Sequence, residues 1–131
     1  MDHKLIFPTY EEMHTKAVKL AHLLKEKNVN FDKMVVVSRG GFVPASVVAY
    51  TLGIQDVDIV SIQSYIHRQV DKAIVHRAPK TDEVVLVIDD IVDQGGTAKA
   101  LKEYMPNMHL EVIYSKPRGS LLYTTQIPRY V

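Results

Sequence analysis

The residues of this chain best suited to chemistry stand together between Val84 and Ala98, in the run VVLVIDDIVDQGGTA. Five apolar residues lead into two adjacent carboxylates, Asp89 and Asp90, and a third, Asp93, follows shortly after them. Carboxylates accept hydrogen bonds from hydroxyl groups and bind hard cations such as Mg²⁺. The run therefore predicts an acidic site for a hydroxylated or metal-bound ligand.

The same run continues into a loop that suits a phosphate group. Gly95 and Gly96 allow the backbone to turn tightly and to approach a ligand closely. A short helix is expected over residues 98–104, so the amides of Gln94 to Thr97 would surround its N-terminus, which favours anions. Acceptors for hydroxyls beside donors for a phosphate predict a sugar phosphate as the ligand.

Strands and helices that would position this site alternate along the chain. The continuous apolar run 84–88 is typical of a strand buried on both faces of a parallel sheet. Further strands are expected at 34–37, 57–62 and 110–114. The alternation predicts an α/β fold, a doubly wound and mostly parallel sheet with flanking helices, as a single domain over residues 1–131. In such sheets ligands bind at the carboxyl ends of the strands.

Two helices are expected in the first half of the chain. Thr9 and Glu12 have the spacing of a capping box, before a helix that would end near Lys27. Pro44 suits the first turn of a second helix, which would stop before Gly53. The segment 64–82 is basic and weakly periodic, and it is too long for an idle connection in so small a domain.

The overall composition narrows the class of protein. Lys and Arg together number 16 and Asp and Glu 15, so no net charge favours nucleic acid or an anionic membrane. The absence of cysteine excludes disulfides and fits a reducing cytoplasm. No apolar run approaches the ~20 residues of a membrane span, and the first six residues are too short and polar for a signal peptide. The six histidines show no metal-ligand spacing.

Four segments of the chain resemble one enzyme family. IDDIVDQGGT is similar to the PRPP-binding motif of the type I phosphoribosyltransferases. SRGGFVPA, LGIQDVDIVSIQSY and SKP match, in the same order, the bacterial xanthine-guanine members of that family. The resemblance implies the type I phosphoribosyltransferase fold. It also implies transfer of the phosphoribosyl group of PRPP to a 6-oxopurine (guanine, xanthine or hypoxanthine), which gives a nucleoside monophosphate and pyrophosphate in purine salvage.

The resemblance assigns roles to the acidic residues. Asp89 and Asp90 would accept hydrogen bonds from the ribose hydroxyls and counter the charge of an oxocarbenium-like state. Asp90 would also lie nearest the Mg²⁺ cofactor that bridges ribose and pyrophosphate. Asp93 would contact purine N7 and act as the general base. Lys116, by the same resemblance, would bind the purine O6 and select oxopurines over adenine.

The resemblance also assigns phosphate contacts. Arg39 and Gly40 match the pyrophosphate loop of the family. Arg68 is the candidate catalytic arginine in the segment 64–82, which in the family is a loop that closes over PRPP. The loop QGGT would bind the 5-phosphate, although Gln94 stands where the family usually has threonine. The expected PRPP contacts are Arg39, Gly40, Asp89, Asp90, Asp93, Gln94, Gly95, Gly96 and Thr97.

The end of the sequence departs from the family. Family members continue past the segment matching residues 127–131 into a Trp-Ile pair that stacks on the purine, and this sequence contains no tryptophan. A truncated C-terminal hood is therefore expected. A PRPP-binding regulatory protein, or a catalytically impaired one, is the alternative function, whereas too few residues follow Asp90 for a phosphotransfer receiver domain. The family commonly assembles into homo-oligomers, either dimers or tetramers.

Overall fold

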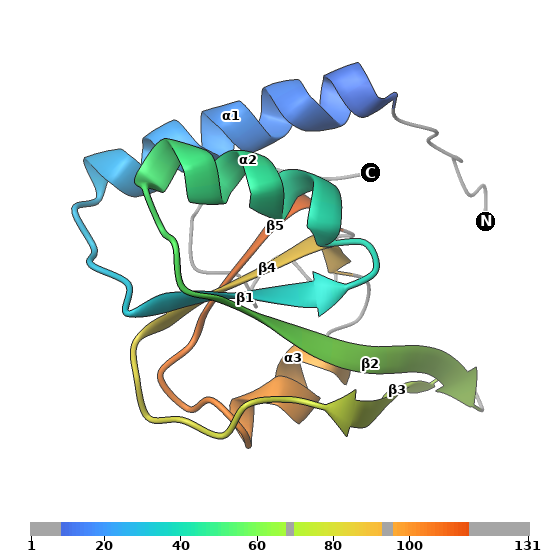
Figure 1. Cartoon of the computed structure of the whole chain (residues 1–131). Helices are drawn as coiled ribbons and strands as arrows, with labels where there is room; N and C mark the ends of the chain where they lie inside the picture. Colours follow the sequence, from blue (N-terminus) through green and yellow to red (C-terminus); the bar gives the residue numbers. More distant parts are fainter. Residues whose placement is uncertain (1–8, 68–69, 93–95, 116–131) are drawn as a thin grey trace.

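The computed structural model describes residues 9–67, 70–92 and 96–115 (Figure 1). Helices and strands alternate through most of this part of the chain. In chain order the elements are α1 (Tyr10–Glu26), β1 (Lys33–Ser38), α2 (Phe42–Leu52), β2 (Val57–His67), β3 (Val70–Arg77), β4 (Val85–Val92), α3 (Gly96–Lys102) and β5 (His109–Ser115).

The strands form one five-stranded sheet in the order β3-β2-β1-β4-β5. β1 pairs in parallel with β2 and β4, and β4 pairs in parallel with β5. β3 pairs with β2 in the antiparallel sense and forms one edge. The predicted doubly wound, mostly parallel sheet is thus confirmed, with β1 and β4 side by side at its centre.

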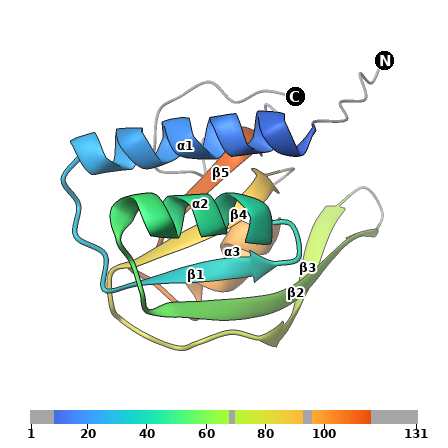
Figure 2. The ribbon, with the colours of Figure 1, turned by 45° about the horizontal axis from the view of Figure 1, so that its top comes forward.

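Helices cover both faces of the sheet (Figures 1 and 2). Side chains alternate between the two faces along a strand, so β1 contributes to two separate clusters. Met34 and Val36 pack with α1 and α2, whereas Val35 and Val37 pack with α3. Burial on both faces explains why the central strands read as continuous apolar runs.

The helix limits follow from local chemistry. The hydroxyl of Thr9 accepts a hydrogen bond from the Glu12 amide at 3.1 Å and donates one to the Glu12 carboxylate at 3.2 Å. The predicted N-terminus of α1 is therefore confirmed. α2 ends at Gly53, whose φ of +72° is a left-handed conformation that glycine adopts without steric cost. Among the described helices, none is both long and apolar enough to cross a membrane.

The interpretation of 64–82 as a loop was wrong for most of its length. β2 continues to His67, and β3 returns beside it, with Gln63 opposite Ile74 and Ile62 opposite Val75. The strand pattern was hidden because β3 exposes both polar and apolar side chains on one face, including Ile74. Antiparallel pairing with β2, which local sequence does not reveal, stabilises this ribbon.

Replacement of Thr9 by alanine removes the side-chain acceptor at the N-terminus of α1. We expect the free energy of unfolding to fall by about 1 kcal/mol. The matched control is Thr15→Ala on the same helix, because the Thr15 hydroxyl donates to the Glu11 carbonyl and caps nothing. That change is expected to alter stability by less than about 0.5 kcal/mol. Equal losses in the two variants, measured by urea denaturation, would contradict the capping role.

Candidate active site

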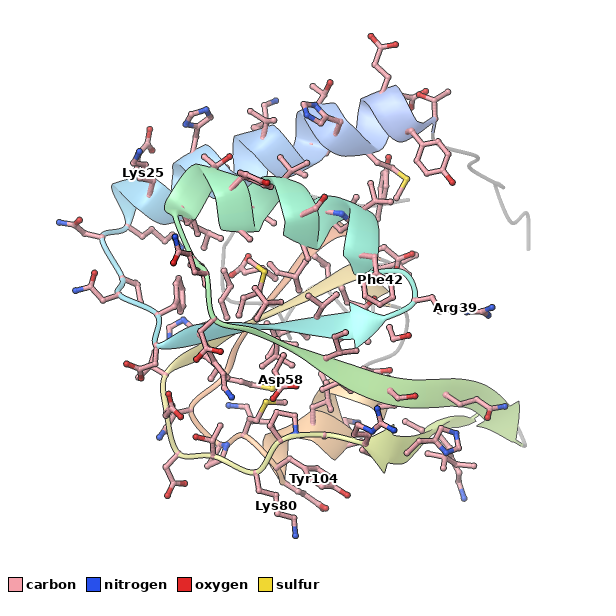
Figure 3. All side chains as sticks on the ribbon, in the orientation of Figure 1. Lys25, Arg39, Phe42, Asp58, Lys80 and Tyr104 are labelled. Atoms are coloured by element: carbon pink, nitrogen blue, oxygen red, sulfur yellow. The ribbon has the colours of Figure 1, made fainter. Side chains whose placement is uncertain are left out.

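The candidate site lies at the carboxyl edge of the sheet, where β1 and β4 end next to each other. The two strands are parallel neighbours, with Val36 opposite Ile88. The turn that follows β1 and the acids near the end of β4 therefore meet at one edge. Figure 3 shows Arg39 at this turn, extending away from the sheet, with Phe42 beside it at the start of α2. Arg39 is exposed.

Gly40 lies directly against the carboxylate of Asp90. A Cβ atom built on Gly40 would overlap all three terminal atoms of the Asp90 side chain, namely Cγ, Oδ1 and Oδ2. With the Asp90 side chain in this position, only glycine leaves room for the approach. The backbone of the predicted pyrophosphate loop and one of the predicted ribose acids are thus brought together, a contact that the sequence did not reveal.

Gly41 is closely packed for a different reason. A Cβ there would overlap the main-chain oxygens of Ile88 and Val37, and the Gly41 amide donates to Val37 at 2.8 Å. The peptide bond between Ser38 and Arg39, earlier in the same turn, is cis. Because it has no side chain, Gly41 holds the start of α2 directly against the backbones of β1 and β4.

The two acids lie within β4 rather than after it, which corrects the expected strand end at Ile88. Pairing with β5 extends the strand, and Asp89 lies opposite Val112. By strand alternation Asp90 shares the face of Ile88, whereas Asp89 shares the opposite face. The Asp90 amide donates to Asp89 Oδ1 at 2.8 Å, which orients the Asp89 carboxyl group.

The environment of Asp89 opposes its ionisation. Burial raises the pKa of Asp89 well above its usual value, and the hydrogen bond and negative charge of the Asp90 side chain raise it further. The hydrogen bond from the Asp90 amide acts in the opposite direction but is the smallest of these effects. A cation or a hydroxyl donor would stabilise the ionised form, so the acid pair is suited to bind either of them.

The acid pair fits one particular kind of magnesium site. Within the described ranges, no group of three or more histidine or carboxylate side chains is placed to hold a metal ion by itself. Mg²⁺ in phosphate-transferring sites is commonly bound by one or two carboxylates together with waters and substrate oxygens. Asp90, with Asp89 beside it, can supply such carboxylates.

The structure describes only some of the other predicted site residues. Gly96 and Thr97 are partly buried at the start of α3. Arg68, Asp93, Gln94, Gly95 and Lys116 lie outside the described residues, and their roles remain predictions.

Sequence reasoning did not single out Tyr114, near the carboxyl end of β5. Its ring is buried, and its hydroxyl has no hydrogen-bond partner in the described part of the chain. The Lys16 ammonium lies 5.2 Å from the ring centroid. Burial, followed by the nearby charge of Glu12, raises the pKa of Tyr114. In the sequence it reads only as the last apolar residue of a strand.

Comparison with known proteins agrees with this fold. Residues 9–119 match the family model for the phosphoribosyl transferase domain, and the chain belongs to that family. The resemblance identified from the sequence is thus confirmed at the level of the family.

Solved structures share the fold at low sequence identity. A purine phosphoribosyltransferase from Pyrococcus horikoshii is 22% identical with a TM-score of 0.70, over 95% of this chain and 84% of that one. The xanthine-guanine-hypoxanthine phosphoribosyltransferase of Helicobacter pylori is 19% identical with a TM-score of 0.71, over 93% and 84% of the two chains. A hypothetical protein from Neisseria gonorrhoeae with bound ppGpp is 21% identical with a TM-score of 0.71, over 98% and 82%.

A double-mutant cycle tests the contact between Gly40 and Asp90. Gly40→Ala should lower the free energy of unfolding by about 1–3 kcal/mol, because the methyl group collides with the carboxylate. In an Asp90→Ala background most of that loss should disappear. Gly41→Ala is the control, because its methyl group meets main-chain oxygens that Asp90→Ala leaves in place. Additive losses for Gly40→Ala and Asp90→Ala in urea denaturation would contradict the contact.

The raised pKa of Asp89 predicts how stability depends on pH in metal-free and ligand-free buffer. An unfolded chain has an aspartate pKa of about 3.9. Between this value and the raised pKa the folded state binds more protons than the unfolded state, so stability falls as pH rises through that interval. Asp89→Asn removes this loss, and its melting temperature should exceed that of the wild type at neutral pH.

The control for this pH dependence is Asp58→Asn. Asp58 lies in β2, away from the candidate site, and forms an ion pair with Lys33 at 3.6 Å. Its melting temperature should stay close to that of the wild type across the same pH range. The difference in melting temperature between Asp89→Asn and the wild type should shrink toward low pH. A difference that is constant with pH would show that Asp89 titrates normally.

Proposed function

We propose that this protein transfers the phosphoribosyl group of PRPP to a 6-oxopurine, with Mg²⁺ as cofactor, to give a nucleoside monophosphate and pyrophosphate. The observation that carries the proposal is the contact of the Gly40 backbone with the Asp90 carboxylate. It joins an arginine-bearing loop, suited to a pyrophosphate, to an acid pair, suited to ribose hydroxyls, at the ligand-binding edge of a parallel sheet. Membership in the family supports the same reaction.

The acid pair would act on the ribose. Asp89 and Asp90 accept hydrogen bonds from the two ring hydroxyls, which favours the ionised form of Asp89 that burial otherwise disfavours. Their negative charge then opposes the positive charge that develops on the ring as the bond to pyrophosphate breaks. Mg²⁺, held by Asp90 with substrate oxygens, would neutralise the negative charge that accumulates on the leaving pyrophosphate.

Two loops would hold the phosphate groups. The Arg39 guanidinium can bind two pyrophosphate oxygens at once, and Gly40, which has no side chain, allows the main chain of the loop to approach the same group. Gln94, Gly95, Gly96 and Thr97 would surround the 5-phosphate. Because Gln94 replaces a hydroxyl donor by an amide, we expect the 5-phosphate to be bound less tightly than in family members with threonine.

The remaining assignments concern the base and the closure of the site. Asp93 would accept the proton that purine N7 loses, and Lys116 would donate a hydrogen bond to purine O6. Arg68 would contact the pyrophosphate and help to exclude water from the reacting ring. The protein would act in the cytoplasm, in purine salvage, as one domain over residues 1–131 and as a homo-oligomer. It would have no nucleic-acid partner.

The direct test is turnover of the purified chain with PRPP, Mg²⁺ and each of guanine, xanthine and hypoxanthine, with adenine as the control base. Nucleotide and pyrophosphate are measured by chromatography. We expect product from at least one oxopurine, none from adenine, and loss of product when EDTA removes the metal. Product from adenine alone would contradict the assigned specificity.

The double variant Asp89→Asn/Asp90→Asn keeps the size of both side chains and removes their charge. We expect kcat to fall about a hundredfold or more, the scale of losing electrostatic stabilisation of a transition state. The chain should remain folded by circular dichroism. Asp58→Asn is the control, and its kcat should match that of the wild type. Wild-type turnover in the double variant would refute the role of the acid pair.

A PRPP-binding regulatory protein is the second candidate. The similar structure from Neisseria gonorrhoeae supports this candidate, because that protein, which has the same fold, was crystallised with bound ppGpp. Calorimetric titration of PRPP and of guanine, each in the presence of Mg²⁺, distinguishes the two candidates. PRPP binding without turnover of any base would favour the regulatory function.

A further inference from the structure

In the described part of the chain, the Tyr114 hydroxyl is the one buried side-chain polar atom without a hydrogen-bond partner. Only 8% of Tyr114 is exposed, so water does not take the place of a protein partner. Buried hydroxyls in native proteins almost always have a partner, and each exception calls for an explanation. Phenylalanine would fill the same space without leaving a polar atom unpaired. The hydroxyl group itself, and not the ring, therefore needs a role.

Tyr114 lies at the carboxyl edge of the sheet, on the same face as Asp90. It pairs with Ile91 of β4, the residue that directly follows Asp90. Its side chain packs in the cluster under α1 and α2, which also contains Ile88. Asp90 shares the face of Ile88 by strand alternation. Tyr114 therefore stands next to the candidate site, on the strand that neighbours the acid pair.

Two charged side chains of α1 determine the state of this tyrosine. The Lys16 ammonium lies 5.2 Å from the ring centroid, an attractive contact that helps to hold the ring in place. Burial, followed by the negative charge of Glu12, raises the pKa of Tyr114. The Glu12 carboxylate itself accepts a hydrogen bond from the Thr9 hydroxyl. The Tyr114 hydroxyl thus stays protonated at neutral pH and is available as a hydrogen-bond donor.

The order of the strands indicates the side from which a base would reach the ribose. β4, which carries the acid pair proposed to bind the ribose, lies between β1 and β5. The turn after β1 carries Arg39 and Gly40, the contacts proposed for the pyrophosphate. A one-step displacement at the sugar carbon brings the incoming group to the face opposite the leaving group. With the pyrophosphate on the β1 side of the ribose, the base arrives from the β5 side.

We propose that the Tyr114 hydroxyl binds the incoming purine by donating a hydrogen bond to a carbonyl oxygen or ring nitrogen on its edge. Tyr114 is the last residue of β5 whose side chain the structure describes, on the strand that borders the base side of the ribose. Lys116, which is predicted to bind the purine O6, follows two positions later in the sequence. The inference rests on the proposed function and adds to it a contact with the base from within a strand of the sheet.

A hydroxyl with this role gives Tyr114→Phe two opposite effects. In the ligand-free protein the substitution removes an unpaired buried polar atom, so the melting temperature should stay the same or rise. In the complex the hydroxyl has an acceptor on the base, so the same substitution should weaken binding of ligands that carry a base. A hydroxyl with a purely structural role would lower the melting temperature and would not distinguish between ligands.

The experiment compares ligands that differ only in the base. Ribose 5-phosphate carries the sugar and the 5-phosphate, and the nucleoside monophosphates of guanine, xanthine and hypoxanthine add the base. Each is titrated into the wild type and Tyr114→Phe by calorimetry. We expect Tyr114→Phe to weaken binding of the nucleotide that the wild type prefers about tenfold, the scale of one lost hydrogen bond. Binding of ribose 5-phosphate should not change.

Turnover supplies a second measurement and Tyr50→Phe the matched control. In Tyr114→Phe the KM for the base should rise, whereas the KM for PRPP should stay the same. Tyr50→Phe removes the same hydroxyl group from a residue of α2 that is 89% exposed. It should change neither the binding of any ligand nor either KM.

Three outcomes overturn the proposal. The first is equal nucleotide affinity in the wild type and Tyr114→Phe, which leaves the proposed reaction standing if the wild type turns over a base. The second is an equal loss for ribose 5-phosphate, or a lower melting temperature of the ligand-free variant, since either shows a structural role. The third is a wild type that binds the nucleotides no more tightly than ribose 5-phosphate. A selective loss of nucleotide affinity in a chain without turnover supports the base contact and contradicts the proposed reaction.

Discussion

The close approach of β1 and β4 is the constraint on which the rest of the site depends. Two parallel neighbours end at the same edge, so the turn after β1 meets the acids of β4. The approach is close enough that Gly40 and Gly41 have no space for a side chain. Gly41 is held against main-chain atoms and Gly40 against the Asp90 carboxylate. The glycines thus bring the loop that carries Arg39 into contact with Asp90 of the acid pair.

The charges of Asp89 and Asp90 decide which ligands this site can bind. Two neighbouring carboxyl groups, both partly buried, resist simultaneous ionisation, and the pKa of Asp89 is raised as a result. Such a pair destabilises the ligand-free protein at neutral pH. The folded protein becomes more stable when a ligand supplies a cation or hydroxyl donors. The arrangement favours a ligand that carries a cation or hydroxyl groups over a purely anionic ligand, since a bare anion would be repelled by the negative charge of the carboxylates.

Within the described part of the chain, the same sheet order that builds the site leaves one side of β2 and β3 without a helix. α2 follows β1 and covers β1 and β4, and no helix joins β2 to β3 because they form an antiparallel ribbon. The apolar face left open begins beside the turn that carries Arg39. The candidate site and this uncovered face are therefore two consequences of one topology.

The sequence alone determined the elements whose signals are local. Thr9 with Glu12 set the start of α1, Gly53 ended α2, and apolar β-branched runs predicted the central strands. The sequence also identified the family, because the motif IDDIVDQGGT is one continuous stretch that can be recognised without knowledge of the fold. The acid pair could be identified from this motif and Gly40 from SRGGFVPA, although the contact between Gly40 and Asp90 could not.

Only the tertiary structure decided which distant residues meet. Gly40 and Asp90 are 50 positions apart in the sequence, which gives no hint that they touch. The contact arises because β1 and β4 become neighbours. The β2–β3 ribbon was missed because its stability comes from cross-strand pairing, and β4 passed its expected end at Ile88 because β5 extends the ladder. Local propensity fixes where helices and strands begin, whereas pairing and burial depend on partners that are remote in the chain.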